Sequence, residues 1–266
     1  MSLTNRLLMQ GIRKEYPGVC ALDGVDFEVV FGEVHALLGV NGAGKSTLMN
    51  ILSGATRMDA GAIFINGTRL DITSPHKAMG LGIGIIYQEF NLVPHLTVAE
   101  NIFLGREPCN RMGFVNYRRM YAEATRLLER LGAPFSPREL VSDLGVAQQQ
   151  LVEIAKALAT EARIIAMDEP TASLSAKETE RLFSIIRLLK TEGKGIIYIS
   201  HRLEEIFEIA DRVTVLRDGR LVETRRLEGV TRERLIEMML GKVLEGKVPT
   251  REVSPKHEVL RVEGLT

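Results

Sequence analysis

A glycine-rich stretch between a predicted strand and a predicted helix could bind phosphate groups. It reads GVNGAGKST, and Gly39, Gly44, Lys45 and Ser46 have the spacing of a phosphate loop. In such loops, backbone N–H groups surround an anion at a helix N-terminus, the lysine reaches the terminal phosphates, and the hydroxyl is a ligand of Mg²⁺. The predicted nucleotide contacts in the loop are Gly39, Asn41, Gly42, Ala43, Gly44, Lys45, Ser46 and Thr47. The stretch predicts the class of ligand but not the task to which it is put.

Acidic, imidazole and amide side chains follow other predicted buried strands. Asp168 and Glu169 close the run RIIAMDEP, so that one carboxylate can hold a metal ion while the next faces an attacking water. Without a phosphate loop, a simple helix start would be a minor alternative for such an acid pair. His201 follows the run GIIYIS, and Gln88 follows GIGIIY. Because ligands of parallel sheets collect beyond the carboxyl ends of the strands, we expect these side chains to converge with Ser46 on one terminal phosphate.

The composition is that of an ordinary globular protein. The chain has 266 residues, of which 45% are hydrophobic and 26% charged, and 34 basic residues balance 34 acidic ones. This balance gives no support to a nucleic-acid partner. Apolar runs fall far short of the roughly 18 residues of a membrane span, and the N-terminus shows no basic and apolar leader, so a cytosolic chain is expected. Cys20 and Cys109 are expected to be reduced thiols.

The first part of the chain predicts strands and turns. DFEVVFGEVHALLGV predicts one strand that enters a covered sheet and leads to Gly39, and His35 within it is interpreted as a satisfied core or edge histidine. A helix after Ser46 is expected to end at Gly54. The run AIFINGTRL predicts an Asn-Gly hairpin, and GIGIIYQ predicts a buried strand that ends at Gln88.

The pattern changes to helical from about residue 91 to 160 and then returns to alternating strands and helices. NYRRMYAEATRLLERLG predicts a helix with Met120, Ala124, Leu127, Leu128 and Leu131 on one face. Farther on, Ser175 and Glu178 predict a capping box. The run VTVLRDGRLVE predicts a hairpin, and TRERLIEMML predicts a terminal helix. The predicted fold class is α/β: a P-loop NTPase core with a mostly parallel sheet, an antiparallel β subdomain and an inserted α-helical subdomain.

In this order, the motifs resemble those of the ATP-binding-cassette (ABC) ATPases over nearly the whole chain. GVNGAGKST is similar to the phosphate loop of that family, YQE to its Gln loop, IIAMDEP to its metal-binding strand and ISH to its switch histidine. The resemblance implies ATP and Mg²⁺ as cofactors. It also implies that Tyr16, which alone would be interpreted as a turn residue, stacks on adenine. The implied catalytic residues are Lys45, Gln88, Glu169 and His201, and the implied metal ligands are Ser46, Gln88 and Asp168.

One motif departs from the family pattern. The family carries a signature LSGGQ, which caps the nucleotide held by the partner domain in a head-to-tail dimer. Here the stretch reads LGVAQ, with Leu144, Gly145, Val146, Ala147 and Gln148. Gly145 lacks the hydroxyl that donates to the γ-phosphate, and a lost donor to a charged group costs about 1.5–3 kcal/mol. The site of this domain therefore looks intact, whereas the site that it completes for a partner looks impaired.

The chain resembles the first half of the tandem ATPases of bacterial monosaccharide importers, the ribose, galactose and xylose type. The resemblance is carried by the divergent signature, by the QQ and VEIAKAL that follow it, and by YPGVCALDGV. This implies an ATPase on the cytoplasmic face of the cell membrane, held there peripherally, that energises sugar import. The implied partners are a second cassette, in the same full-length chain or as a homodimer, and membrane permease subunits; a periplasmic or extracellular sugar-binding protein would act indirectly. Residues 91–105 are where we expect the permease contact, with a packed loop and helix as the plain alternative. The sugar itself is not identified.

The implied domains are a cassette at residues 1–242, with the helical subdomain at about 91–160, and a polar linker at 243–258. Residues 259–266, VLRVEGLT, echo LLMQGI near the N-terminus, either as the start of a second cassette or as a chance likeness of two strands.

Two other functions remain open. A soluble, non-transport ABC ATPase that acts on ribosomes or DNA would usually carry basic arms or long charged linkers, and neither appears. An ATP-binding regulatory module without turnover is disfavoured by Glu169 and His201 but favoured by the divergent signature.

Overall fold

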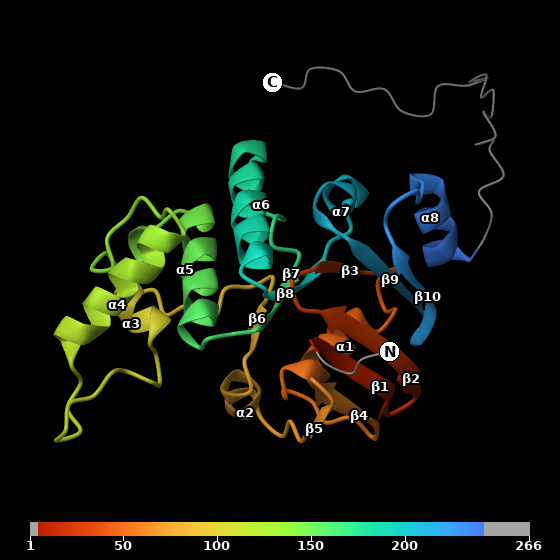
Figure 1. Ribbon diagram of the computed structural model, residues 1–266, viewed down its shortest axis with the longest axis horizontal. Coiled ribbons are helices and arrows are strands. Elements are labelled where there is room, and N and C mark those ends of the chain that lie inside the picture. The colour runs from red at the N-terminus through yellow and green to blue at the C-terminus, as the bar shows by residue number, and fades with distance from the viewer. Residues whose placement is uncertain (1–4, 242–266) are drawn as a thin grey trace, which may run out of the picture.

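The computed structural model describes residues 5–241, in which two β-sheets and their covering helices form the fold (Figure 1). The larger sheet has six strands in the order β10-β9-β3-β8-β7-β6. All neighbours pair in parallel except β10, which is antiparallel to β9. Its strands are β3 (Val34–Leu38), β6 (Ile83–Ile86), β7 (Ile164–Asp168), β8 (Gly195–Ile199), β9 (Arg212–Arg217) and β10 (Arg220–Arg226). The α/β fold class with a mostly parallel sheet is confirmed.

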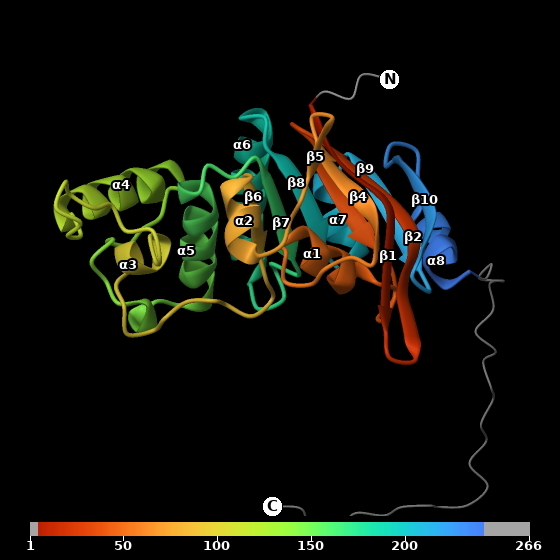
Figure 2. The ribbon, with the colours of Figure 1, turned by 90° about the horizontal axis from the view of Figure 1, so that it is seen from below.

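A smaller antiparallel sheet covers one face of the larger one (Figure 2). Its order is β2-β1-β4-β5, with β1 (Arg6–Tyr16), β2 (Val19–Val30), β4 (Ala60–Ile65) and β5 (Thr68–Leu70). Helices α1 (Lys45–Leu52) and α2 (Pro75–Gly80) pack with it on this face. The predicted Asn-Gly hairpin joins β4 to β5, with Asn66 at φ 52° and Gly67 at φ 79°, as a two-residue turn of this kind requires.

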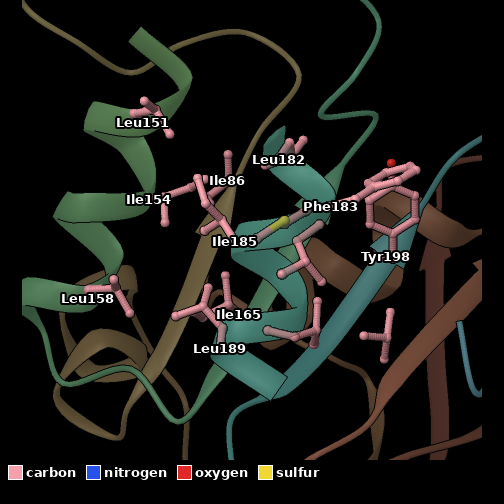
Figure 3. Close-up of a cluster of buried hydrophobic side chains, with 14 of the residues drawn as sticks. Ile86, Leu151, Ile154, Leu158, Ile165, Leu182, Phe183, Ile185, Leu189 and Tyr198 are labelled. Carbon is pink, nitrogen blue, oxygen red and sulfur yellow. The ribbon is translucent and has the colours of Figure 1, made fainter. Parts of the chain in front are cut away.

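Strands β3 and β8 are buried along their whole length because both faces of the sheet are covered. In β8, Ile196 and Tyr198 belong to one buried cluster, whereas Ile197 and Ile199 belong to the other. Figure 3 shows the first cluster, in which side chains of helices α5 and α6 pack against those of the strands. Alternate residues of one strand therefore hold two different layers on the sheet.

The helices of the first cluster divide into two groups. Helices α3 (Val98–Ile102), α4 (Tyr117–Arg130) and α5 (Val146–Ala159) pack on one another beyond the β6 edge of the sheet (Figure 1). Helix α4 buries Met120, Ala124 and Leu128, as its spacing predicts. Helices α6 (Ala176–Thr191), α7 (Leu203–Ile209) and α8 (Arg232–Leu240) cover the rest of that face. Ser175 and Glu178 form the predicted capping box of α6.

One predicted strand is two strands in the structure. DFEVVFGEVHALLGV was expected to be continuous, but β2 ends at Val30 and β3 begins at Val34, in the other sheet. Gly32 makes the turn between them at φ 84°, and its N–H donates to the carbonyl of Lys194 at 3.1 Å. Because apolar residues continue through both strands, periodicity alone does not reveal the break.

The strand before Gln88 is also shorter than expected. Strand β6 ends at Ile86, so Gln88 lies beyond it in a loop rather than at its last position. His201 likewise follows Ser200, beyond the end of β8. The predicted linker at 243–258 and the tail at 259–266 lie outside the described residues.

Candidate active site

The glycine-rich loop runs from β3 to α1, and its path depends on glycine at two points. A Cβ on Gly39 would lie 2.5 Å from the carbonyl oxygen of Leu216, in β9. A Cβ on Gly44, where φ is 101°, would lie 2.7 Å from the carbonyl oxygen of Ala21, in β2. Any side chain at either position would collide with backbone that the two sheets hold in place. The loop is therefore fixed between β9 and β2.

The N-terminus of α1 is suited to an anion. Within the described part of the chain no side chain caps this helix, and its N-cap is Gly44. The N–H groups of the first helical turn have no partner within the helix, so an anion at this end can accept from them. Ser46 is exposed in the first turn, whereas Ala43 is 1% exposed and turns its side chain into the core. Of the predicted contacts, Ala43 can therefore offer only backbone groups.

Lys45 supplies a cation beside this helix end. Its Nζ donates to the carbonyl oxygens of Gly39 at 2.7 Å and Val40 at 3.1 Å. Burial lowers the pKa of Lys45, and the charges of Asp168 and Glu169 oppose that shift. Lys45 thus lies close enough to both carboxylates to feel their charge. Backbone N–H groups, an ammonium, a hydroxyl and carboxylates form a donor set that fits a Mg²⁺-bound triphosphate.

Asp168 and Glu169 differ in environment although they are neighbours in sequence. Asp168 is the last residue of β7, and burial, followed by the charge of Glu169, raises its pKa. Glu169 has left the strand and takes a left-handed conformation at φ 47°, uncommon for a residue with a side chain. Its backbone N–H donates to the carbonyl oxygen of Ile199 at 2.9 Å, which ties it to the end of β8.

His201 reaches Glu169 from the neighbouring strand. Its Nδ1 lies 3.1 Å from Oε1 of Glu169, with side-chain exposures of 67% for the histidine and 25% for the glutamate. An ionised carboxylate only accepts hydrogen bonds, so Nδ1 donates to it and Nε2 of a neutral ring is left as an acceptor. The structure thus pairs a carboxylate with an imidazole next to the phosphate loop.

Gln88 lies in the same neighbourhood. It is exposed and lines a surface hollow together with Asp168, Asn50 and Asn91. Two hydrogen bonds attach the loop that carries Gln88 to helix α5. Glu153 Oε1 accepts from the N–H of Asn91 at 2.7 Å, and Lys156 Nζ donates to the carbonyl oxygen of Asn91 at 2.8 Å.

Glu153 and Lys156 were not among the site residues predicted from the sequence. Glu153 is only 6% exposed, and burial raises its pKa. The signal was present, because a glutamate within the apolar run of a predicted helix requires a buried partner.

Tyr16 is the last residue of β1, opposite Val19 in the β1–β2 hairpin, and is 42% exposed. Lys14 Nζ lies 5.4 Å from the centre of its ring. Farther along β2, Ala21 contacts the phosphate loop at Gly44. The aromatic ring therefore lies in the β1–β2 hairpin, whose other strand borders the loop, as stacking on an adenine would need.

The stretch LGVAQ lies elsewhere. Gly145 is the N-cap of α5, and its N–H donates to Oε1 of Gln148 at 2.9 Å. Leu144 is buried, whereas Val146 is 43% exposed. Helices α5 and α1 stand apart in both views (Figures 1 and 2). The chain therefore gathers Lys45, Asp168, Glu169 and His201, with Gln88 close to Asp168, and presents Leu144–Gln148 on a separate part of the molecule.

The fold is that of a P-loop NTPase, and comparison with known proteins identifies the family. The family model described as "ABC transporter" matches residues 22–172. The chain therefore belongs to the ABC transporter family and is an ATP-binding cassette.

Relatives and solved structures agree with this assignment. The ribose import ATP-binding protein RbsA 1 of Rubrobacter xylanophilus is 57% identical over 97% of this chain and 52% of its own length. A putative ribose/galactose/methyl galactoside import ATP-binding protein of Agrobacterium fabrum is 51% identical over 98% of this chain and 52% of its own. The chain thus spans about half the length of these relatives. Among solved structures, this chain is similar to the ADP conformation of MJ1267, an ATP-binding cassette of an ABC transporter, with a TM-score of 0.75 and 26% sequence identity. The match covers 89% of this chain and 98% of MJ1267.

Among the helices between residues 5 and 241, none combines the length and the apolarity that crossing a membrane requires.

Proposed function

We propose that this chain is an ATP-hydrolysing cassette that energises the import of a sugar through an ABC transporter. The observation that carries the proposal is the Glu169–His201 pair, 3.1 Å apart, beside the phosphate loop and Lys45. A phosphate loop alone would support only nucleotide binding. A carboxylate beside the loop that is hydrogen-bonded to an imidazole supports ATP hydrolysis. The relatives named for ribose and galactoside import support the choice of sugar as the cargo.

In this proposal the residues of the chain divide the work of hydrolysis. The backbone N–H groups from Gly39 to Thr47 and Nζ of Lys45 hold the phosphates, and Tyr16 stacks on the adenine. Ser46, Gln88 and Asp168 would hold Mg²⁺, which would supply positive charge to neutralise the phosphates.

One oxygen of the Glu169 carboxylate accepts the proton of the attacking water, and His201 orients that carboxylate by donating from Nδ1 to Oε1. Burial raises the pKa of the neighbouring Asp168, and a cation beside it would favour the ionised carboxylate.

A second cassette completes the proposed machine. Leu144, Gly145, Val146, Ala147 and Gln148 would face the nucleotide of the partner, where Gly145 offers no hydroxyl to the γ-phosphate. The partner would in turn cap the nucleotide held by Lys45. The site built on this chain's own phosphate loop is then the competent one. The partner is either a second copy of this chain in a homodimer or a second cassette in the same full-length chain. Relatives about twice as long support the second alternative.

The remaining partners follow from transport. Permease subunits would contact residues 91–105, where Val93 and Leu104 are exposed at 38% and 41% although Val98, Ala99 and Asn101 are buried. A periplasmic or extracellular sugar-binding protein would act through the permease. The chain would lie peripherally on the cytoplasmic face of the cell membrane. We also propose residues 1–242 as the cassette, 91–160 as its helical subdomain, 243–258 as a linker and 259–266 as the start of a second cassette.

The test is steady-state ATPase activity of this chain, alone and mixed with the part of Rubrobacter xylanophilus RbsA 1 that this chain does not match. Marked stimulation by that part is expected, because it would supply the missing signature. Equal activity with and without it, rising with the square of the protein concentration, would show that LGVAQ works in a homodimer. No ATP turnover in either case, with ATP still bound, would favour the regulatory module.

A further inference from the structure

A buried carboxylate joins the loops that carry Glu169 and His201. Glu205 lies in the first turn of α7 and is 7% exposed. Its Oε1 accepts from the hydroxyl of Thr171 at 2.7 Å. Its Oε2 accepts from the hydroxyls of Ser200 at 2.8 Å and Tyr198 at 2.9 Å. One side chain of α7 therefore receives hydrogen bonds from the ends of both β7 and β8.

Two of these donors lie next to the Glu169–His201 pair in the chain. Thr171 follows Glu169 and Pro170 and is 1% exposed. Ser200 immediately precedes His201 and is 6% exposed. The hydroxyl of Ser200 also accepts from the N–H of Arg202 at 3.0 Å, so it holds the chain on both sides of the histidine.

Glu205 adds a second link to the one that the backbone makes. The first link is the bond from the Glu169 N–H to the carbonyl of Ile199. Both links connect the same two loops, one at the level of Glu169 and one through Thr171 and Ser200. With only the backbone bond, the loops could still rotate about it and change the distance between the two side chains.

The carboxylate is the group that this arrangement needs. Three hydroxyls donate to it, and an ionised carboxylate accepts at all its sites without donating. Arg202 Nη1 at 3.4 Å balances the charge. An amide in its place has one accepting oxygen and two donor hydrogens, so at least one hydroxyl would have to turn away. Burial and then the charge of Glu205 raise the pKa of Tyr198, which keeps this phenol protonated as a donor.

We propose that Glu205 is a positioning residue that fixes the Thr171 and Ser200 loops relative to each other and thereby holds His201 at hydrogen-bonding distance from Glu169. The role in turnover rests on the function proposed above. The role in holding the pair does not, because it concerns a contact within the chain that can be measured without ATP.

The experiment compares Glu205→Gln with the unchanged chain in two measurements. The first is ATP turnover at saturating ATP, together with the Kd for a fluorescent mant-ATP. The second is the ring tautomer of His201 by long-range ¹H–¹⁵N correlation NMR without nucleotide, assigned with a His201→Gln variant. We expect turnover to fall at least about 10-fold with less than about a 3-fold change in Kd, because small displacements of reacting groups cost rate rather than affinity. We also expect the Nδ1–H tautomer of His201, dominant in the unchanged chain, to become a mixture of the two tautomers.

A matched control separates positioning from stability. Glu28→Gln makes the same chemical change at a partly buried carboxylate that binds Arg6 and Arg212 in another part of the molecule. It should lower the melting temperature but leave the tautomer and turnover unchanged. If Glu205→Gln behaves like Glu28→Gln in both measurements, Glu205 is only a structural residue and the proposal is overturned.

A second variant keeps the test informative if Glu205→Gln does not fold. Thr171→Val keeps the shape of the side chain and removes one arm of the link, so it should shift the same two measurements in the same direction by less. An unchanged tautomer in a folded Thr171→Val chain would overturn the proposal. If the unchanged chain hydrolysed no ATP even when mixed with the unmatched part of RbsA 1, the proposed function would fail, whereas the tautomer measurement would still decide the role of Glu205.

Discussion

Nδ1 of His201 and Oε1 of Glu169 lie 3.1 Å apart although 32 positions separate the two residues in the chain. They meet because β7 and β8 are parallel neighbours whose carboxyl ends lie at the same edge of the sheet. Helix α6 makes the crossover between these strands, and the buried packing seen in Figure 3 fixes the helix on the sheet. The pair is thus held by the core rather than by the loops alone.

Replacing Glu169 by glutamine should leave nucleotide binding and remove turnover. The amide keeps the size of the side chain but accepts no proton from water, and loss of a general base costs roughly 10²- to 10⁴-fold in rate. ATPase assays at saturating ATP and mant-ATP titrations measure the two effects. Glu192→Gln, which affects an exposed ion pair with Arg130, is the control and should change neither. Unchanged hydrolysis by Glu169→Gln would remove Glu169 from this role.

Replacing Lys45 by alanine should weaken ATP binding at least about 10-fold, because a charge-assisted contact to phosphate is lost. It should not lower the melting temperature, since burial lowers the pKa of Lys45 and so opposes its charged form in the folded chain. Isothermal titration with Mg-ATP and thermal unfolding test both statements. Lys77→Ala, which loses an exposed ion pair with Asp71, serves for comparison. Equal affinities for the two variants would contradict the placement of the phosphates at Lys45.

Introducing serine at Gly145 should strengthen ATP-dependent self-association. The backbone there has φ −68° and ψ 162°, and a Cβ would meet only Oε1 of Gln148 at 3.7 Å, so the side chain fits. A serine hydroxyl would supply the absent donor, worth about 1.5–3 kcal/mol toward a charged phosphate. Sedimentation velocity with and without ATP, on a Glu169→Gln background, measures the association.

Gly145→Ala is the control for this change, because it adds the Cβ without the hydroxyl. If alanine and serine act alike, or if serine has no effect, Leu144–Gln148 does not contact a nucleotide in the dimer.

The buried His35 should make the chain less stable as the pH falls. It is fully buried, with Nε2 2.7 Å from Oγ1 of Thr214, and burial lowers its pKa. Its folded pKa therefore lies below its unfolded pKa of about 6.5. The unfolded chain binds more protons below that value, so the stability present at neutral pH is lost toward acid, with a slope of at most about 1.4 kcal/mol per pH unit.

Denaturant unfolding of the unchanged chain and of His35→Gln, between about pH 7 and about pH 5, measures this contribution. The difference between the two chains matters, because the pKa values of Asp168 and Glu153 are raised and act with the opposite sign at lower pH. A difference that stays constant with pH would show that His35 does not titrate in this way.

The sequence by itself determined the features that depend on residues close together in the chain. The order of glycines before Lys45 defines a phosphate loop because few other structures use those residue types at that spacing. The Asn66–Gly67 turn and the Ser175–Glu178 box were predicted correctly, since each depends on neighbours within a few positions. The buried face of α4 followed from its periodicity for the same reason.

Only the tertiary structure decided which distant residues meet. The break at Gly32 sends β2 and β3 into different sheets, and the sequence does not reveal it because apolar residues stand on both sides of the turn. The buried bonds of Glu205 to Thr171 and Ser200 are likewise invisible in sequence, where each residue reads as a polar side chain near a strand or helix end. Sequence fixes the type and local spacing of donors and acceptors, whereas their partners depend on strand order, and strand order is set by the packing of the whole core.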